Sequence, residues 1–264
     1  MNRLDKLFAE KRKNVLGVYF TAGFPVGSSI VAMATNLANS GVDFVEVGMP
    51  FSDPLADGPV IQESSSVALK GGMTISKLFS ELKSLRASTE VPVVLMGYLN
   101  PVMQFGFEKF LSECSSCGVD GIILPDLPVE VYITEYKILF ERYGIYPVFL
   151  ISPQTPAERV KYIAGESKGF VYLVSSSATT GSNGELSPEQ QNKLKETISV
   201  VENVPVMVGF GIHDSKSFKA ATKYAAGGIV GTAFIRALGS DPKSAIENTI
   251  KKIKPEHYDH SVVG

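Results

Sequence analysis

The sequence has no tryptophan, two cysteines and three histidines among its 264 residues. Two cysteines are too few for the disulfide framework of a small secreted domain. The longest apolar stretches, such as the one that begins at Val91, fall far short of the ~18 residues that indicate a membrane span. The stretch from residue 1 to residue 14 is charged throughout and lacks the apolar centre of a secretory signal. We therefore expect a cytoplasmic protein that does not contact a membrane.

The sequence also has no excess of positive charge. Its 25 Lys and Arg residues against 27 Asp and Glu residues give a formal net charge of −2. A protein that binds nucleic acid needs a basic surface to displace counterions from phosphates, and we find no such cluster. Hydrophobic residues make up 44% of the chain, which is typical of a folded enzyme. The composition thus argues against disorder and against a nucleic-acid partner.

Short runs rich in β-branched residues alternate along the chain with segments of helical spacing such as Ile75, Leu78, Phe79 and Leu82. The eight runs are VLGVYFT from Val15, VDFVEVG from Val42, VPVVLMG from Val91, VDGIILP from Val119, IYPVFLI from Ile145, FVYLVS from Phe170, VPVMVG from Val204 and GGIVG from Gly227. Strands that alternate with helices pair in parallel through right-handed crossovers. Eight such units indicate an α/β fold, a (β/α)₈ TIM barrel, with residues 1–264 as a single domain.

Two features modify this barrel, and one alternative to it stays open. Leu4, Leu7 and Phe8 predict a short extra helix before the first strand, where it could close one end of the barrel. The long connection after the second strand predicts two helices, at 59–69 and 74–85, so one is extra.

A doubly wound sheet is the alternative to the barrel. Against it, the glycines at 209 and 211 are not followed by the third glycine of a dinucleotide-binding fingerprint.

In the second strand, Phe44, Glu46 and Gly48 alternate with two valines. Since the outward face should be apolar, Glu46 is expected to point into the barrel. A buried carboxylate is costly unless it is paired or neutral, so Glu46 is a candidate general acid and base with a raised pKa. The alternative is a structural hydrogen-bonding role. Asp53 and Asp57 follow in the next loop, where they either take part in catalysis or cap a turn or the helix that begins near Pro59.

Glycine-rich loops follow the last two predicted strands, at 209–211 and at 231–232. Barrel enzymes often bind phosphate there, with backbone N–H groups of a helix N-terminus. The hydroxyl-rich segment 175–184 follows the sixth strand and could form a lid. A phosphorylated substrate is therefore expected.

The other residue types restrict the reaction mechanisms that the site could use. None of the eight runs contains the lysine that a Schiff-base aldolase requires. His213 lies beside Asp214, a candidate helix cap, and the other histidines, His257 and His260, lie in the polar tail, so no cluster of metal ligands is evident. Cys114 and Cys117 have a C-x-x-C spacing but are interpreted as reduced thiols on a helix. The mechanism that the sequence still allows is acid–base chemistry without a metal or an organic cofactor.

The segment EVGMPFSDPLADGPVIQ, from Glu46 to Gln62, resembles the signature of the tryptophan synthase α subunit family. The resemblance continues in TAGFP at Thr21, GYLNPVMQFGFEKF at Gly97, GVDGIILPDLP at Gly118 and GFGI at Gly209. It implies a TIM barrel that splits indole-3-glycerol phosphate into indole and glyceraldehyde 3-phosphate by a retro-aldol reaction. This is carbon–carbon lyase chemistry in tryptophan biosynthesis.

The resemblance also implies roles for particular residues. Glu46 would be the acid and base, and Asp57 would accept a hydrogen bond from the indole N–H. The positions that match substrate or phosphate contacts are Tyr172, Thr180, Gly181, Gly211, Gly231 and Thr232. Those that match surfaces facing a partner are Pro50, Asp53, Asn100 and Pro101. The partner is a β subunit in an α₂β₂ complex, and the pyridoxal phosphate of that complex belongs to the β subunit, not to this chain.

The sequence departs from the family pattern at Phe24, Ala178 and His213. None of these replaces either carboxylate. Two other functions stay open at this stage. One is another enzyme of the phosphosugar-binding barrels, including the synthase that makes the same substrate. The other is a subunit that binds a phosphorylated metabolite without catalysis.

Overall fold

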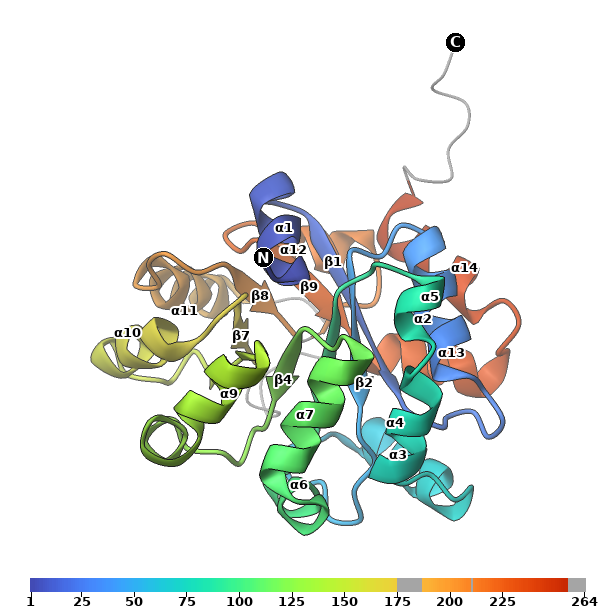
Figure 1. Ribbon diagram of the computed structural model, residues 1–264. Helices are drawn as coiled ribbons and strands as arrows, with labels where there is room; N and C mark the ends of the chain where they lie inside the picture. Colours follow the sequence, from blue (N-terminus) through green and yellow to red (C-terminus); the bar gives the residue numbers. More distant parts are fainter. Residues whose placement is uncertain (175–186, 210, 256–264) are drawn as a thin grey trace.

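The computed structural model describes residues 1–174, 187–209 and 211–255. Within these residues, nine parallel strands form one sheet, and helices surround it (Figure 1). The strands are β1 (Val15–Thr21), β2 (Phe44–Gly48), β3 (Val93–Met96), β4 (Gly121–Ile123), β5 (Tyr146–Pro147), β6 (Leu150–Ile151), β7 (Val171–Leu173), β8 (Val206–Val208) and β9 (Gly227–Val230). Most of their residues are buried, as expected for a parallel sheet that helices cover.

The sheet closes on itself. Its order is β5-β4-β3-β2-β1-β9-β8-β7-β6, so β5 and β6 lie at the two ends of the order. The two residues between them join these ends. The N–H of Val148 donates to the carbonyl of Ile122 in β4 (3.0 Å), and the carbonyl of Phe149 accepts from the N–H of Tyr172 in β7 (3.0 Å). The TIM-barrel prediction is confirmed, and the doubly wound alternative is wrong.

The fifth predicted run, from Ile145, is the one that differs from the expectation. It was expected as a single strand, and it forms the two short strands β5 and β6 instead. Pro147 is the last residue of β5 and has no N–H to donate to a neighbouring strand. This explains why nine strands make a barrel of eight βα units.

The helices surround the strands, and several of them lie in the connections between strands. They are α1 (Arg3–Glu10), α2 (Ile30–Asn39), α3 (Pro59–Lys70), α4 (Ile75–Leu82), α5 (Leu85–Ser88), α6 (Leu99–Phe105), α7 (Phe107–Cys117), α8 (Val129–Val131), the π-helix η1 (Tyr132–Tyr136), α9 (Lys137–Tyr143), α10 (Ala157–Glu166), α11 (Pro188–Ser199), α12 (Ser215–Thr222), α13 (Thr232–Ser240) and α14 (Ala245–Ile253). The second helix predicted after β2 is divided into α4 and α5. Nowhere in the described segments is a helix long and apolar enough to cross a membrane.

Helix α1 covers the N-terminal end of the barrel (Figure 1). Asn2 begins it, because its side chain accepts a hydrogen bond from the N–H of Leu4 (2.9 Å). Leu4 and Phe8 are buried, and the ring of Phe8 lies 6.2 Å from that of Phe170, the residue before β7. The predicted extra N-terminal helix is therefore present, and its apolar face packs onto the strands.

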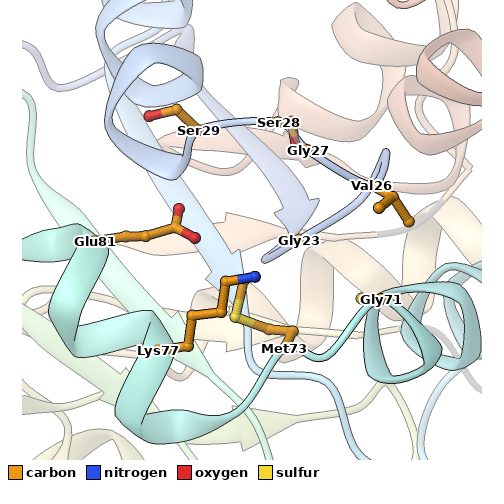
Figure 2. A pocket seen from close by; sticks show the side chains of 10 residues that line it. Gly23, Val26, Gly27, Ser28, Ser29, Gly71, Met73, Lys77 and Glu81 are labelled. Atoms are coloured by element: carbon orange, nitrogen blue, oxygen red, sulfur yellow. The ribbon is translucent and has the colours of Figure 1, made fainter.

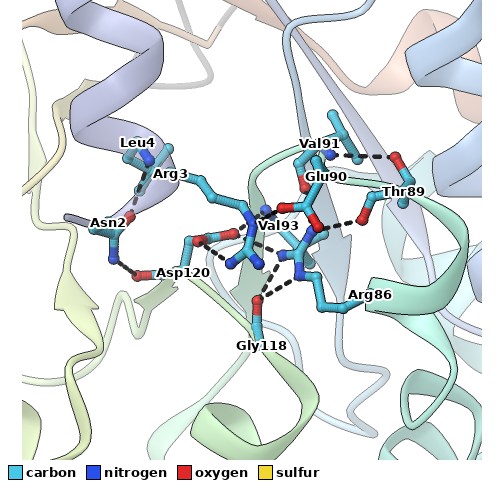
Figure 3. A network of polar contacts seen from close by, with 10 residues as sticks. All are labelled: Asn2, Arg3, Leu4, Arg86, Thr89, Glu90, Val91, Val93, Gly118 and Asp120. Carbon is cyan, nitrogen blue, oxygen red and sulfur yellow. Dashed lines mark hydrogen bonds and ion pairs between the residues drawn. The ribbon is translucent and has the colours of Figure 1, made fainter.

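A buried ionic network fastens the same end (Figure 3). Asp120 precedes β4 and is 2% exposed. Its carboxylate pairs with Arg86 of α5 at 2.8 Å and with Arg3 of α1 at 3.2 Å, and it accepts from the N–H of Val93 at 2.8 Å. Arg86 also donates to the carbonyl of Gly118. Since a buried carboxylate needs partners for its oxygens, this network ties α1 and α5 to the strands.

Candidate active site

At the other end of the barrel, where the strands end, lies a cavity of about 460 Å³ that we call the mouth cavity. It is lined by Tyr19, Glu46, Ala56, Asp57, Gly58, Ile61, Met96, Leu150, Tyr172, Val174, Gly209, Gly211, Ile212, His213, Ile229, Gly231, Thr232, Ala233 and Arg236. The residues come from β1, β2, β3, β6, β7 and β9, from the segments that follow β2, β7, β8 and β9, and from helices α3 and α13. This is the end at which barrel enzymes carry their active sites.

The volume of the cavity alone does not identify the site, because two other cavities are as large. One of about 460 Å³ lies between the loop after β1 and the helices α3 and α4 (Figure 2). Its charged side chains are Lys77, which is exposed, and Glu81, which already accepts from the N–H of Ile30 at 3.3 Å. Another of about 490 Å³ lies against α1 at the opposite end of the barrel. The mouth cavity differs from both in its chemistry.

Glu46 points into the mouth cavity from the middle of β2, as its alternation predicted. The residue is 1% exposed, and its Oε2 atom has no hydrogen-bond partner among the described residues. Burial, and then the negative charge of Asp57, raise the pKa of this carboxyl group to about 8. Among the described residues, the structural hydrogen-bonding role therefore has no partner at Oε2. A neutral carboxylic acid facing a cavity can donate a proton.

Asp57 reaches the same cavity from the loop after β2. Its Oδ2 atom accepts a hydrogen bond from the hydroxyl of Tyr98 (3.0 Å), and Gln62 donates to its backbone carbonyl (2.8 Å). Burial raises the pKa of Asp57, and the hydrogen bond from Tyr98 opposes that rise. The two carboxyl groups of the cavity therefore have different surroundings. A pair of this kind can hold one neutral acid and one carboxylate together.

Neither aspartate of this loop caps α3. Gly58 is the N-cap residue, no side chain makes a capping hydrogen bond there, and Pro59 follows. The carboxylate of Asp57 is bonded to Tyr98 instead, and that of Asp53 accepts from the hydroxyl of Ser52 (2.5 Å). The alternative in which they cap this helix is therefore wrong.

The other side of the mouth cavity is formed by the start of α13 and the loop after β8. Gly231 is the N-cap residue of α13, and among the described residues no side-chain capping hydrogen bond is made there. The first N–H groups of a helix have no partner within it, and the helix dipole adds positive potential there. Gly211 has a φ of 64°, which a residue with a side chain rarely adopts. Thr232 begins α13 and is exposed. This side of the cavity is suited to an anion.

The structure brings together six of the predicted site residues: Glu46, Asp57, Tyr172, Gly211, Gly231 and Thr232 all line the mouth cavity. The predicted lid at 175–184, with Thr180, Gly181 and the departure at Ala178, lies outside the described residues.

The four positions predicted to face a partner do not line the mouth cavity. Asp53 and Asn100 are exposed, and Pro50 and Pro101 are half-buried.

Other predicted features also have clear places. Asp214 caps α12, because its side chain accepts from the N–H of Ser217 (2.7 Å). His213 lines the mouth cavity, with its Nδ1 2.7 Å from the carbonyl oxygen of Gly211. Cys114 and Cys117 are buried free thiols on α7. Across the described ranges, no group of three His, Cys, Asp or Glu side chains could hold a metal ion.

Sequence reasoning missed several residues of the site. Tyr19 alternates with Gly17 on the inner face of β1, so the argument used for Glu46 could have found it. The ring of Tyr172 lies where a Cβ atom at Gly209 would be, which explains the glycine there. Tyr98 and Arg236 gave no comparable signal, because each lies outside the strands.

Comparisons with known proteins match nearly the whole chain to one family. A family model described as tryptophan synthase alpha chain matches residues 4–261. The tryptophan synthase alpha chain of Christiangramia forsetii is 46% identical over 254 residues, which cover 96% of this chain and 99% of that protein. That of Flavobacterium psychrophilum is 45% identical over 253 residues, with 96% and 100% covered.

Solved structures of this family have the same fold. A crystal structure of the tryptophan synthase alpha chain from Legionella pneumophila has a TM-score of 0.85 and 32% identity, and covers 100% of this chain and 99% of that one. The aminoacrylate-bound form of tryptophan synthase from M. tuberculosis gives a TM-score of 0.83 at 28% identity, with 96% and 98% covered. The chain belongs to the tryptophan synthase alpha chain family.

Proposed function

We propose that the chain cleaves indole-3-glycerol phosphate into indole and glyceraldehyde 3-phosphate by a retro-aldol reaction, as the α subunit of tryptophan synthase. The observation that carries the proposal is Glu46. Its carboxyl group is buried at the mouth cavity, lacks a partner for Oε2 among the described residues, and shares the cavity with Asp57 and the start of α13. One cavity therefore offers a proton donor, a carboxylate and an anion site.

Glu46 would move the protons. In the first step, its neutral carboxyl group donates a proton to C3 of the indole, which makes the ring an electron acceptor. The resulting carboxylate then accepts the proton of the glycerol hydroxyl next to the ring. As that proton leaves, the O–H electron pair forms the aldehyde C=O bond, and the C–C electron pair returns to the ring. Indole and glyceraldehyde 3-phosphate are released, and Glu46 is again protonated.

Asp57 would stabilise the positive charge that the ring carries between these steps. Protonation at C3 makes the indole N–H more acidic, and a carboxylate that accepts this hydrogen bond favours the cation. The hydrogen bond from Tyr98 favours the ionised form that this role requires. Ile61, Met96 and Leu150 are apolar residues of the same cavity and would contact the ring.

The phosphate would bind at the start of α13, with the backbone at Gly211 and Gly231 and the hydroxyl of Thr232. Arg236, one turn further along α13, lines the same cavity and adds a positive charge. Tyr172 would form a wall of the substrate site. By the family resemblance, Thr180 and Gly181 would complete the site and its lid.

The partner would be a tryptophan synthase β subunit, in an α₂β₂ complex. The loop after β2 carries Asp53, and helix α6 after β3 carries Asn100; both are exposed, and Pro50 and Pro101 lie on the same segments. Two large apolar side chains lie on the same segments: Leu55 is 93% exposed and Met103 is 48% exposed. A β subunit bound at these segments would cover both side chains. The cofactor pyridoxal phosphate belongs to the β subunit, this chain needs none of its own, and the complex works in the cytoplasm.

The test is an assay of the purified protein with indole-3-glycerol phosphate, in which indole and glyceraldehyde 3-phosphate are measured separately. Equal amounts of both products are expected, with a loss of roughly 10²-fold or more in Glu46→Gln and in Asp57→Asn. Substrate binding without products would indicate a non-catalytic subunit. Turnover of a different phosphosugar would indicate another barrel enzyme.

A further inference from the structure

Tyr98 lies between the mouth cavity and helix α6. It follows β3, is 7% exposed, and is the N-cap residue of α6. Its hydroxyl makes two hydrogen bonds to the loop after β2: it accepts from the N–H of Ala56 (3.0 Å) and donates to Oδ2 of Asp57 (3.0 Å). Its ring lies 5.2 Å from that of Phe51 in the same loop. One side chain thus contacts this loop at three points.

The other contacts of this loop do not hold the Asp57 carboxylate. Gln62 donates to the backbone carbonyl of Asp57, and the N–H of Asp57 donates to the carbonyl of Pro54. Both fix the path of the chain and leave the side chain free to rotate. In the part of the chain that the structure describes, Tyr98 is the one residue whose side chain donates to this carboxylate.

Hydrogen bonds hold the backbone on both sides of Tyr98. The backbone after Tyr98 is fixed because the N–H of Leu99 donates to both carboxylate oxygens of Asp126, at 2.9 and 3.0 Å. The N–H of Gly97 donates to the carbonyl of Ile123 in β4, so the residue before Tyr98 is also held (3.1 Å). A residue whose backbone is held on both sides can fix the position of a neighbouring side chain to within a fraction of an ångström.

We propose that Tyr98 is the positioning residue of the active site: its hydroxyl holds the Asp57 carboxylate toward the mouth cavity and keeps the loop after β2 against the start of α6. The proposal rests on the proposed function, in which Asp57 meets the indole N–H. Tyr98 itself acts through Asp57.

The hydrogen bond from Tyr98 also affects the charge state of Asp57. Burial disfavours the Asp57 carboxylate, and the Tyr98 hydroxyl favours it. The titratable or charged groups that share the cavity with Asp57 are Glu46 from β2, Tyr19 from β1, Tyr172 from β7, His213 after β8 and Arg236 of α13. All of them remain when the Tyr98 hydroxyl is removed. The pKa of Asp57 should therefore rise in Tyr98→Phe.

A double-mutant cycle tests the proposal. In Tyr98→Phe, kcat/KM for the cleavage should fall by roughly ten- to a hundredfold, mainly through kcat. The same change made in Asp57→Asn should cost less than about threefold, because Tyr98 would act through a carboxylate that is already absent. An equal loss in both backgrounds, or no loss in either, would overturn the proposal. Tyr143→Phe is the matched control, since its hydroxyl donates to the exposed carboxylate of Glu108 at 3.1 Å, and it should retain full activity.

A second measurement needs no substrate. The pKa of Asp57 is followed by NMR in protein with ¹³C-labelled aspartate, and its signal is identified by its loss in Asp57→Asn. The pKa of Asp57 should be higher in Tyr98→Phe than in wild type, and unchanged in Tyr143→Phe. An unchanged value in Tyr98→Phe would contradict the proposal. If Asp57→Asn instead cleaves the substrate at full rate, the proposed role of Asp57 fails, and this titration still decides what Tyr98 does.

Discussion

Glu46 lowers the stability of the folded protein at neutral and alkaline pH. Its pKa is about 8 in the folded chain, against an ordinary value of 4.5. As pH rises from about 4.5, the unfolded chain loses this proton first, so stability falls until about pH 8 and then stays low. Glu46→Gln should therefore resist urea better than wild type at pH 8, by on the order of a few kcal/mol.

The difference in stability between Glu46→Gln and wild type should disappear below about pH 4.5, where the carboxyl group of Glu46 is neutral in the folded and the unfolded chain. Glu130→Gln, at an exposed ion pair with Arg159, is a control that should show no such gain. If Glu46→Gln is no more stable than wild type at pH 8, the carboxyl group does not bear the desolvation that we ascribe to it.

Arg236 is exposed and yet lines the mouth cavity near the start of α13. A guanidinium in this place would attract the substrate phosphate before and after the chemical step alike. Such uniform binding affects KM and leaves kcat nearly unchanged. Arg236→Gln should thus raise KM by about tenfold, and added salt should reduce the difference. Lys243→Gln, an exposed cation outside the cavity, is the control. An unchanged KM in Arg236→Gln would remove this residue from the phosphate site.

At the scale of elements, two neighbouring helices differ in how they begin. Helix α12 has a capping box between Asp214 and Ser217, whereas α13 begins at Gly231 without a side-chain cap. A capped helix needs no anion at its N-terminus, but an uncapped helix at a cavity leaves N–H groups for a ligand. The sequence indicates how each helix begins, because Asp214 is a good cap and the glycine at 231 has no side chain.

The network around Asp120 joins elements that are far apart in the sequence (Figure 3). Asp120→Asn would leave Arg86 without its buried anionic partner. Loss of one partner from a buried ion pair costs about 3–5 kcal/mol, so unfolding in urea should require markedly less denaturant. The exposed pair of Glu130 and Arg159 gives the comparison, and Glu130→Gln should leave the urea midpoint nearly unchanged. Similar losses in the two variants would mean that the network does not fasten α1 and α5 to the barrel.

The limits of sequence reasoning at this scale lie in two connections. Apolar spacing predicted one helix over 74–85, but the chain forms α4 and then α5, with Lys83 and Ser84 between them. The run from Ile145 has the composition of one strand, but Pro147 ends its first half. Apolar periodicity identifies an element, and it locates the breaks within the element less well.

For the whole molecule, the alternation of strands with helices and the number of runs were enough to predict the barrel, and the alternation of residues within β2 predicted its inward side. All eight predicted runs contain observed strands, and the closure follows from their number. Glu46 could be predicted because a strand fixes the direction of its side chains. Tyr98 and Arg236 could not, because their place depends on how a loop and a helix end pack. Asp57 was predicted through the family resemblance, and its contact with Tyr98 needed coordinates.

The central claim is that Glu46 is the proton donor and is neutral when substrate binds. The pH dependence of kcat/KM for indole release, measured on wild type and Glu46→Gln together, tests it most directly, since this parameter reports the free enzyme. The wild-type value should fall tenfold per pH unit above about pH 8, where Glu46 ionises. Glu46→Gln should be slower by roughly 10²-fold or more below that pH and should show no such fall. A Glu46→Gln variant with the wild-type profile would contradict the account.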